Sequence, residues 1–154
     1  MEKTNVMRLL AQNNIPFTAH SYDPTVTEGE KVAELVGAPC ERTFKTLVTA
    51  APNKTHFVFV IPVHKTLDLK KAAKAAGVKS IAMIPQKELL PLTGYIHGGC
   101  SPIGMKKKFE TFYDQSITAY ETIFCSAGKV GQQIEIQPQA LIEFTNGRLA
   151  QIGA

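Results

Sequence analysis

The spacing of apolar residues along the chain alternates between the period of a helix and the period of a strand. Thr4 precedes an apolar stripe and is a favoured N-cap, which predicts a helix over residues 5–13. Thr27 and Glu30 have the spacing of a capping box, and Gly37 is a stop signal, so a second helix is expected between them. Caps, N-terminal prolines and glycine stops predict further helices over residues 68–77, 85–90 and 138–144.

Alternating or continuous apolar runs predict the strands. They cover residues 17–22, 43–50, 56–63, 80–84, 111–113, 122–126, 133–136 and 148–152. The short polar loop 51–54 joins two of them as a hairpin. Residues 57–61 are apolar at every position, which indicates a strand buried on both faces.

Hairpins mixed with single helices do not follow the strict alternation of a doubly wound sheet. We therefore expect an α+β fold, with a curled, mixed and mostly antiparallel sheet or distorted barrel flanked by helices. A chain of 154 residues is long enough for one domain, 1–154, with a real core, and too short for two comfortable domains.

Composition narrows the class of protein. Hydrophobic residues make up 44% and charged residues 19%, as in an ordinary globular protein. No apolar run approaches the roughly 20 residues that a membrane helix needs, and the N-terminus does not read as a signal peptide, so a cytosolic location and no membrane partner are expected. The three cysteines and four histidines lack the spacing of a disulfide framework or a metal site.

The most informative segment is 94–104, which holds four glycines and is followed by the lysines 106–108. Glycine allows positive φ angles and a close approach of the backbone to a ligand, so N–H groups of such a loop can face an electron-rich group. Lys45 lies in the apolar run 44–48, where a solvated lysine is not expected. Together they predict a site for an ester, carboxylate or phosphate, with the lysines 106–108 as a candidate phosphate-facing rim beside the loop.

Three segments in the same order, 44–48, 93–104 and 126–131, closely resemble the YbaK family of aminoacyl-tRNA editing domains. The resemblance covers the chain to about Ile152. It implies a mixed α/β barrel-like fold, and a hydrolase that removes a wrong amino acid from tRNA, mainly cysteine from proline tRNA. It also implies no cofactor and action beside prolyl-tRNA synthetase. Thr46 after the key lysine favours the cysteine-clearing branch over the alanine-clearing one, whereas Gln133 and Glu28 depart from residues of some cysteine-clearing members.

The ester substrate that this family implies would pass through a tetrahedral oxyanion on hydrolysis. We expect Lys45, Gly98 and Gly99 to stabilise it, Lys45 by binding the carbonyl oxygen or a terminal phosphate. Lys45 could instead be a strand lysine that reaches solvent. The expected pocket wall consists of Tyr22, Thr46, Ser101, Ser126 and Gln133.

No side chain stands out as a nucleophile. Cys100 is expected to be a small, partly buried filler. His97 or His20 could act as a general base, but neither has an evident carboxylate partner in the sequence, so both are expected to be structural. The resemblance implies that the thiol of the substrate attacks its own ester carbonyl and releases a cyclic thiolactone. Three other functions stay open: a deacylase for alanine or another small residue, a non-catalytic adapter for aminoacyl-tRNA, and a general nucleic-acid-binding domain.

Overall fold

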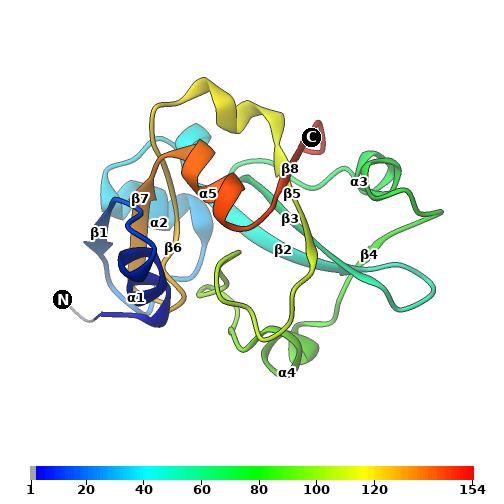
Figure 1. The fold of residues 1–154 in the computed structure, drawn as a ribbon, viewed down its shortest axis with the longest axis horizontal. Helices are drawn as coiled ribbons and strands as arrows, with labels where there is room; N and C mark the ends of the chain where they lie inside the picture. Colours follow the sequence, from blue (N-terminus) through cyan, green and yellow to red (C-terminus); the bar gives the residue numbers. More distant parts are fainter. Residues whose placement is uncertain (1–2) are drawn as a thin grey trace.

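The computed structural model describes residues 3–154, and its strands form two sheets (Figure 1). The first sheet is antiparallel, with the order β1 (Phe17–Ser21), β7 (Gln132–Ile136) and β6 (Ile123–Ser126). The second has the order β4 (Ala82–Met83), β2 (Phe44–Ala50), β3 (His56–Pro62), β5 (Glu110–Asp114) and β8 (Arg148–Ala150). An isolated bridge between Thr43 and Phe124 links the two sheets.

The second sheet is mixed. Strands β2 and β3 form the predicted antiparallel hairpin, whereas β3 pairs with β5, and β5 with β8, in parallel. The α+β class with a mixed sheet, predicted from the sequence, is confirmed. The strands are divided between two linked sheets, and this division places the three-stranded sheet beside the start of β2.

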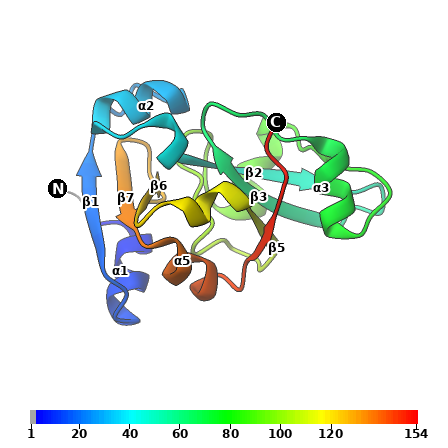
Figure 2. The same cartoon turned by 90° about the horizontal axis from the view of Figure 1, so that it is seen from above.

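The helices pack around these sheets. They are α1 (Asn5–Gln12), α2 (Gly29–Val36), α3 (Leu69–Ala76), α4 (Leu89–Thr93) and α5 (Pro138–Phe144), with short 3-10 turns at Cys40–Arg42, Gln86–Glu88 and Gln115–Ala119. In two perpendicular views, α1 and α2 lie at the end occupied by the three-stranded sheet and α3 lies at the opposite end (Figure 2). Within residues 3–154, no helix has the length and apolar character needed to span a lipid bilayer.

Strand β3 supplies both hydrophobic cores, as its continuous apolar run predicts. Val58 and Val60 belong to a core that also contains residues of α1, α5 and the three-stranded sheet. Phe57, Phe59 and Ile61 face the other way, into a core closed by α3. Because successive side chains of a strand point to opposite faces, one apolar strand can hold both cores together.

Two local predictions are wrong. The capping box at Thr27 is not formed, because α2 begins at Gly29 and its N-cap, Glu28, makes no side-chain capping bond. The predicted strand 148–152 ends at Ala150, because the N–H of Ile152 donates to Asp114 and its carbonyl accepts from Asp68. By contrast, Thr4 and Asp68 cap α1 and α3 as predicted.

Asp114 ties the C-terminal segment to the five-stranded sheet. Its Oδ1 accepts from the N–H groups of Ile152 at 3.2 Å and Gly153 at 2.9 Å, and its Oδ2 accepts from the N–H and hydroxyl of Ser116. Burial favours the neutral carboxyl, but these hydrogen bonds outweigh it and lower the pKa of Asp114 below 3.8.

We predict that Asp114→Asn lowers the free energy of unfolding by about 1–3 kcal/mol at pH 7, because the amide cannot accept from donors on both sides. Since the pKa is lowered in the folded state, the carboxylate stabilises the fold above its unfolded pKa, and this contribution disappears as pH falls through the folded pKa. Urea unfolding at pH 7 and at pH 3 measures the difference, with Glu121→Gln, an exposed carboxylate, as the control. A destabilisation of equal size at both pH values would contradict the role of the charge.

Candidate functional site

A cavity of about 450 Å³ lies where the two sheets meet the start of α2. Its walls come from β2, from β6 and β7, from residues 27–29 before and at the start of α2, and from the glycine-rich loop after α4. Segments distant in sequence therefore converge on one hollow. Lys45, the glycine loop 94–104 and Ser126, which begins the second glycine loop (residues 126–131), thus meet at one site.

The cavity brings together six of the residues expected at the site. They are Tyr22, Lys45, Thr46, Gly98, Ser126 and Gln133. Gly99 and Ser101 do not line it. The N–H of Gly99 donates to the carbonyl of Ile96 at 3.0 Å, and the hydroxyl of Ser101 is fully buried and accepts from the N–H of Ile103.

The conformation of Gly98 explains the glycine at that position. Its φ is +88°, and a Cβ there would lie 2.9 Å from a side-chain carbon of Thr27. A larger residue would be strained and would push against the opposite wall of the cavity. No acceptor among residues 3–154 takes the Gly98 N–H, so this donor is available to a ligand.

Lys45 is the cation of this cavity. It is half-buried on β2, and burial lowers its pKa while the negative charge of Glu30 opposes that shift. Within the described chain, the ammonium group has no hydrogen-bond or ion-pair partner. A partly desolvated lysine without an internal partner is suited to bind an oxygen of a ligand.

Three buried polar atoms without a hydrogen-bond partner also belong to this cavity. They are the Tyr22 hydroxyl, Thr46 Oγ1 and Gln133 Oε1, and they are the buried side-chain atoms of residues 3–154 found in that condition. A buried polar atom left unpaired costs about 1–3 kcal/mol. Their concentration in one hollow indicates that a polar ligand satisfies them.

The cavity offers no ready nucleophile. Cys100 lines it, but burial raises the pKa of the Cys100 thiol to about 12, so the thiol stays protonated at neutral pH. Ser126 accepts from the N–H of Gly128 at 3.1 Å and so orders the second glycine loop. Within residues 3–154, no three His, Cys, Asp or Glu side chains gather as metal ligands.

Sequence reasoning missed a cluster of polar residues on the first sheet. His20 Nε2 lies 3.2 Å from Glu135 Oε1, although no carboxylate partner was expected for it. Glu135 also accepts from the Thr122 hydroxyl at 2.6 Å and from Arg42 at 3.4 Å. The hydrogen bond from Thr122, with further contributions from His20 and Arg42, outweighs burial and lowers the pKa of Glu135. His20 is thereby held as a structural residue, and it does not line the cavity.

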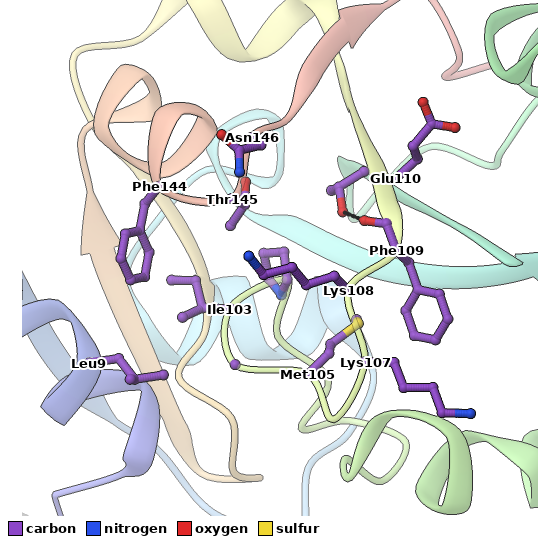
Figure 3. Close-up of a pocket in the computed structure, with 13 residues that line it drawn as sticks. Leu9, Ile103, Met105, Lys107, Lys108, Phe109, Glu110, Phe144, Thr145 and Asn146 are labelled. Atoms are coloured by element: carbon purple, nitrogen blue, oxygen red, sulfur yellow. Dashed lines mark hydrogen bonds between the residues drawn. The ribbon is translucent and has the colours of Figure 1, made fainter.

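The lysines after the glycine loop do not line the Lys45 cavity. Lys107 and Lys108 line a separate hollow of about 480 Å³, with apolar walls that include Phe109 and Phe144 (Figure 3). In this view Lys108 extends across the hollow, and Lys107 points away from its centre. These lysines therefore do not contribute to the Lys45 cavity, and their role as a phosphate-facing rim beside the glycine loop stays a prediction.

Comparison with known proteins decides the family. The family described as "Aminoacyl-tRNA editing domain" matches residues 23–144, which include every segment of the cavity except Tyr22. This chain belongs to the aminoacyl-tRNA editing domain family. The resemblance inferred from the glycine loops and Lys45 is thereby confirmed.

This editing domain has relatives of two sizes. It is 45% identical over 153 residues to an Enterococcus faecalis protein named "Putative Cys-tRNA(Pro)/Cys-tRNA(Cys) deacylase EbsC", covering 98% of this chain and 93% of that protein. It is also 27% identical over 142 residues to a proline–tRNA ligase of Burkholderia orbicola, covering 87% of this chain and only 24% of the ligase.

Solved structures show the same fold. One described as "a putative trans-editing enzyme for prolyl tRNA synthetase" superposes with a TM-score of 0.85 at 19% identity, covering 100% of this editing domain and 99% of that chain. Another, described as hypothetical protein APE2540, has a TM-score of 0.89 at 22% identity, covering 99% of this chain and 100% of that one. At such identities the likeness concerns the fold alone.

Proposed function

We propose that this chain is an aminoacyl-tRNA deacylase that acts in trans on Cys-tRNA(Pro). The observation that carries the proposal is the cavity, where an unpartnered lysine and three unpaired buried polar atoms face the same space. Membership of the editing family and the name of the Enterococcus faecalis relative support the substrate. Thr46 after Lys45 favours cysteine as the amino acid removed.

The proposed chemistry begins with the ester carbonyl. Lys45 binds the carbonyl oxygen or a phosphate of the tRNA end, and the Gly98 N–H faces the oxygen on which negative charge develops. Fixed donors of this kind contribute about 3–4 kcal/mol of transition-state stabilisation each. Gly99 and Ser101 act indirectly, because their N–H and hydroxyl groups hold the glycine loop in shape. Tyr22, Thr46, Ser126 and Gln133 form the wall against the aminoacyl group.

The nucleophile in this proposal is the thiol of the substrate. Its sulfur attacks the ester carbonyl carbon, a C–S bond forms, the C–O bond to the ribose breaks, and the thiol proton goes to the ribose oxygen. The products are a cyclic thiolactone and free tRNA. The protonated Cys100 thiol supports this route, because it leaves the cavity without a protein thiolate. Proximity and fixed dipoles then supply the rate enhancement.

The proposed partner, prolyl-tRNA synthetase, is suggested by the ligases that contain a segment similar to this chain. A segment similar to this chain makes up 24% of the Burkholderia orbicola proline–tRNA ligase. We infer that this editing domain works in the cytoplasm beside prolyl-tRNA synthetase, which supplies the tRNA selectivity that a small cavity for the aminoacyl end lacks.

We predict that the purified chain releases cysteine from Cys-tRNA(Pro) at least about 10-fold faster than it releases alanine from Ala-tRNA(Pro), the size of a pocket's discrimination for one side-chain group. The measurement is the loss of labelled amino acid from each charged tRNA at equal concentration. Preferential loss of alanine would make the chain an alanine deacylase. Binding of both tRNAs without cleavage would contradict catalysis and leave an adapter.

A further inference from the structure

Gln133 places an unpaired hydrogen-bond acceptor in a buried position on a central strand, where leaving it unpaired destabilises the fold. It lies in β7, the central strand of the first sheet, with His20 of β1 and Ser126 of β6 as its neighbours on the two sides. Gln133 is buried, with an exposed fraction of 5%, and its Oε1 has no hydrogen-bond partner among residues 3–154. An amide oxygen accepts hydrogen bonds and does not donate them, so whatever satisfies it must be a donor.

Lys45 and Gln133 Oε1 offer a ligand opposite hydrogen-bonding capacities. Lys45 is on β2 of the five-stranded sheet and Gln133 is on β7 of the three-stranded sheet, so different sheets contribute them to the cavity. The lysine is a donor with a positive charge, and it binds oxygen atoms and repels cations. Gln133 offers the opposite capacity, an acceptor. The cavity thus offers Lys45 to an electron-rich group of the ligand and Gln133 to a hydrogen-bond donor of the ligand.

A free aminoacyl ester has groups of both kinds, and the α-ammonium group is its charged donor. Its carbonyl oxygen is the acceptor, and its α-ammonium group is a charged donor with three N–H bonds. Glu28 also lines the cavity, and its exposed carboxylate adds negative charge on the side of α2. The hydroxyls of Tyr22 and Thr46, also unpaired, can accept further hydrogen bonds.

We propose that Gln133 Oε1 accepts a hydrogen bond from the α-ammonium group of the aminoacyl substrate, so that the cavity selects esters with a free amino group. This inference deepens the proposed deacylase function and rests on its substrate class. Peptidyl or N-acylated ends, in which the nitrogen has lost its charge and gained bulk, are rejected.

The test uses an analogue that cannot be cleaved, 3′-(L-cysteinylamino)-3′-deoxyadenosine, and its N-acetyl derivative, with binding measured by calorimetry. The wild-type chain is expected to bind the free amine about 10- to 100-fold more tightly than the acetylated form, the range for a hydrogen bond to a charged group. In Gln133→Leu this ratio falls to near one. The control, Gln132→Leu, changes the adjacent glutamine, whose Oε1 accepts from Ser21, and keeps the wild-type ratio.

Thermal unfolding separates recognition from damage. Removing an unpaired buried acceptor should leave the unfolding midpoint of Gln133→Leu equal to or above that of the wild type. Gln133→Asn, with a shorter amide, serves as the second variant and is expected to keep part of the preference. Equal binding of the two analogues by the wild type, or a proportional loss of both in Gln133→Leu, would overturn the inference.

The outcome is independent of cleavage. A chain that prefers the free amine and leaves Cys-tRNA(Pro) intact would contradict the deacylase and retain the ammonium site. A chain that cleaves Cys-tRNA(Pro) and N-acetyl-Cys-tRNA(Pro) at equal rates would overturn the ammonium site and retain the deacylase.

Discussion

Lys45→Met is expected to reduce kcat/KM for the deacylation of Cys-tRNA(Pro) about 100- to 1,000-fold, the cost of losing one donor to a developing oxyanion. Methionine retains an unbranched apolar stem and removes only the charge and the hydrogen bonds. Among residues 3–154, Lys45 has no hydrogen-bond or ion-pair partner, so no other side chain there loses such a bond in the variant. Single-turnover release of labelled cysteine measures the effect.

The stability of this variant is also predictable. Burial lowers the pKa of Lys45, which means that the fold disfavours its charged form. Lys45→Met should therefore unfold at the same temperature as the wild type or at a higher one. Lys79→Met, at an exposed position outside the cavity, is the matched control and should keep full activity. Activity of Lys45→Met within a few-fold of the wild type would show that Lys45 is a strand lysine that merely reaches solvent.

Replacing cysteine by serine in the substrate is expected to lower the deacylation rate about as much as Lys45→Met does. Ser-tRNA(Pro) should be deacylated at least about 100-fold more slowly than Cys-tRNA(Pro), because a hydroxyl is far less nucleophilic than a thiol at neutral pH. The two substrates differ by one atom, so binding contributes little to the difference. Mass spectrometry of the first turnover should detect the thiolactone before water hydrolyses it to free cysteine.

Two results bear on this route. Equal rates for serine and cysteine esters would mean that water attacks the carbonyl, and the substrate thiol would have no role. Cys100→Ala provides the other control. The Cys100 thiol, with its pKa near 12, should not be a nucleophile, and its removal should change the rate less than 3-fold or so. A large loss of activity in Cys100→Ala would indicate that the Cys100 thiol, and not the substrate thiol, takes part in the reaction.

Elements whose signals are local were predicted well. Thr4 and Asp68 accept from N–H groups three residues ahead, and such caps depend only on their own helix. The continuous apolar run of β3 shows that both its faces are covered, whatever covers them. The capping box predicted at Thr27 is not formed, because the position of Thr27 depends on residues that are distant in the sequence. The Thr27 side chain packs against Gly98, a residue from a distant loop, and this tertiary contact outweighs a weak local preference.

The family motifs pointed to Lys45 and Gly98, but their neighbours were only partly identified. Gly99 and Ser101 belong to the same motif as Gly98, yet their groups point into the loop rather than into the cavity. The lysines 106–108 directly follow that motif, and two of them line another hollow. Proximity in sequence does not decide which side of a loop faces a ligand, because loop backbones turn at each glycine with a positive φ.

The amino-acid sequence alone determined the α+β class, the order of helices and strands, the editing family and the lysine at its centre, because periodicity, caps and motifs are short-range signals. Only the tertiary structure decided that Gln133, Tyr22 and Thr46 leave polar atoms unpaired around Lys45, and that Glu135 holds His20. These facts depend on strand register and on pairs such as His20 and Glu135, which are 115 positions apart. Whether a buried polar atom is satisfied is a property of the packed interior, which no local pattern records.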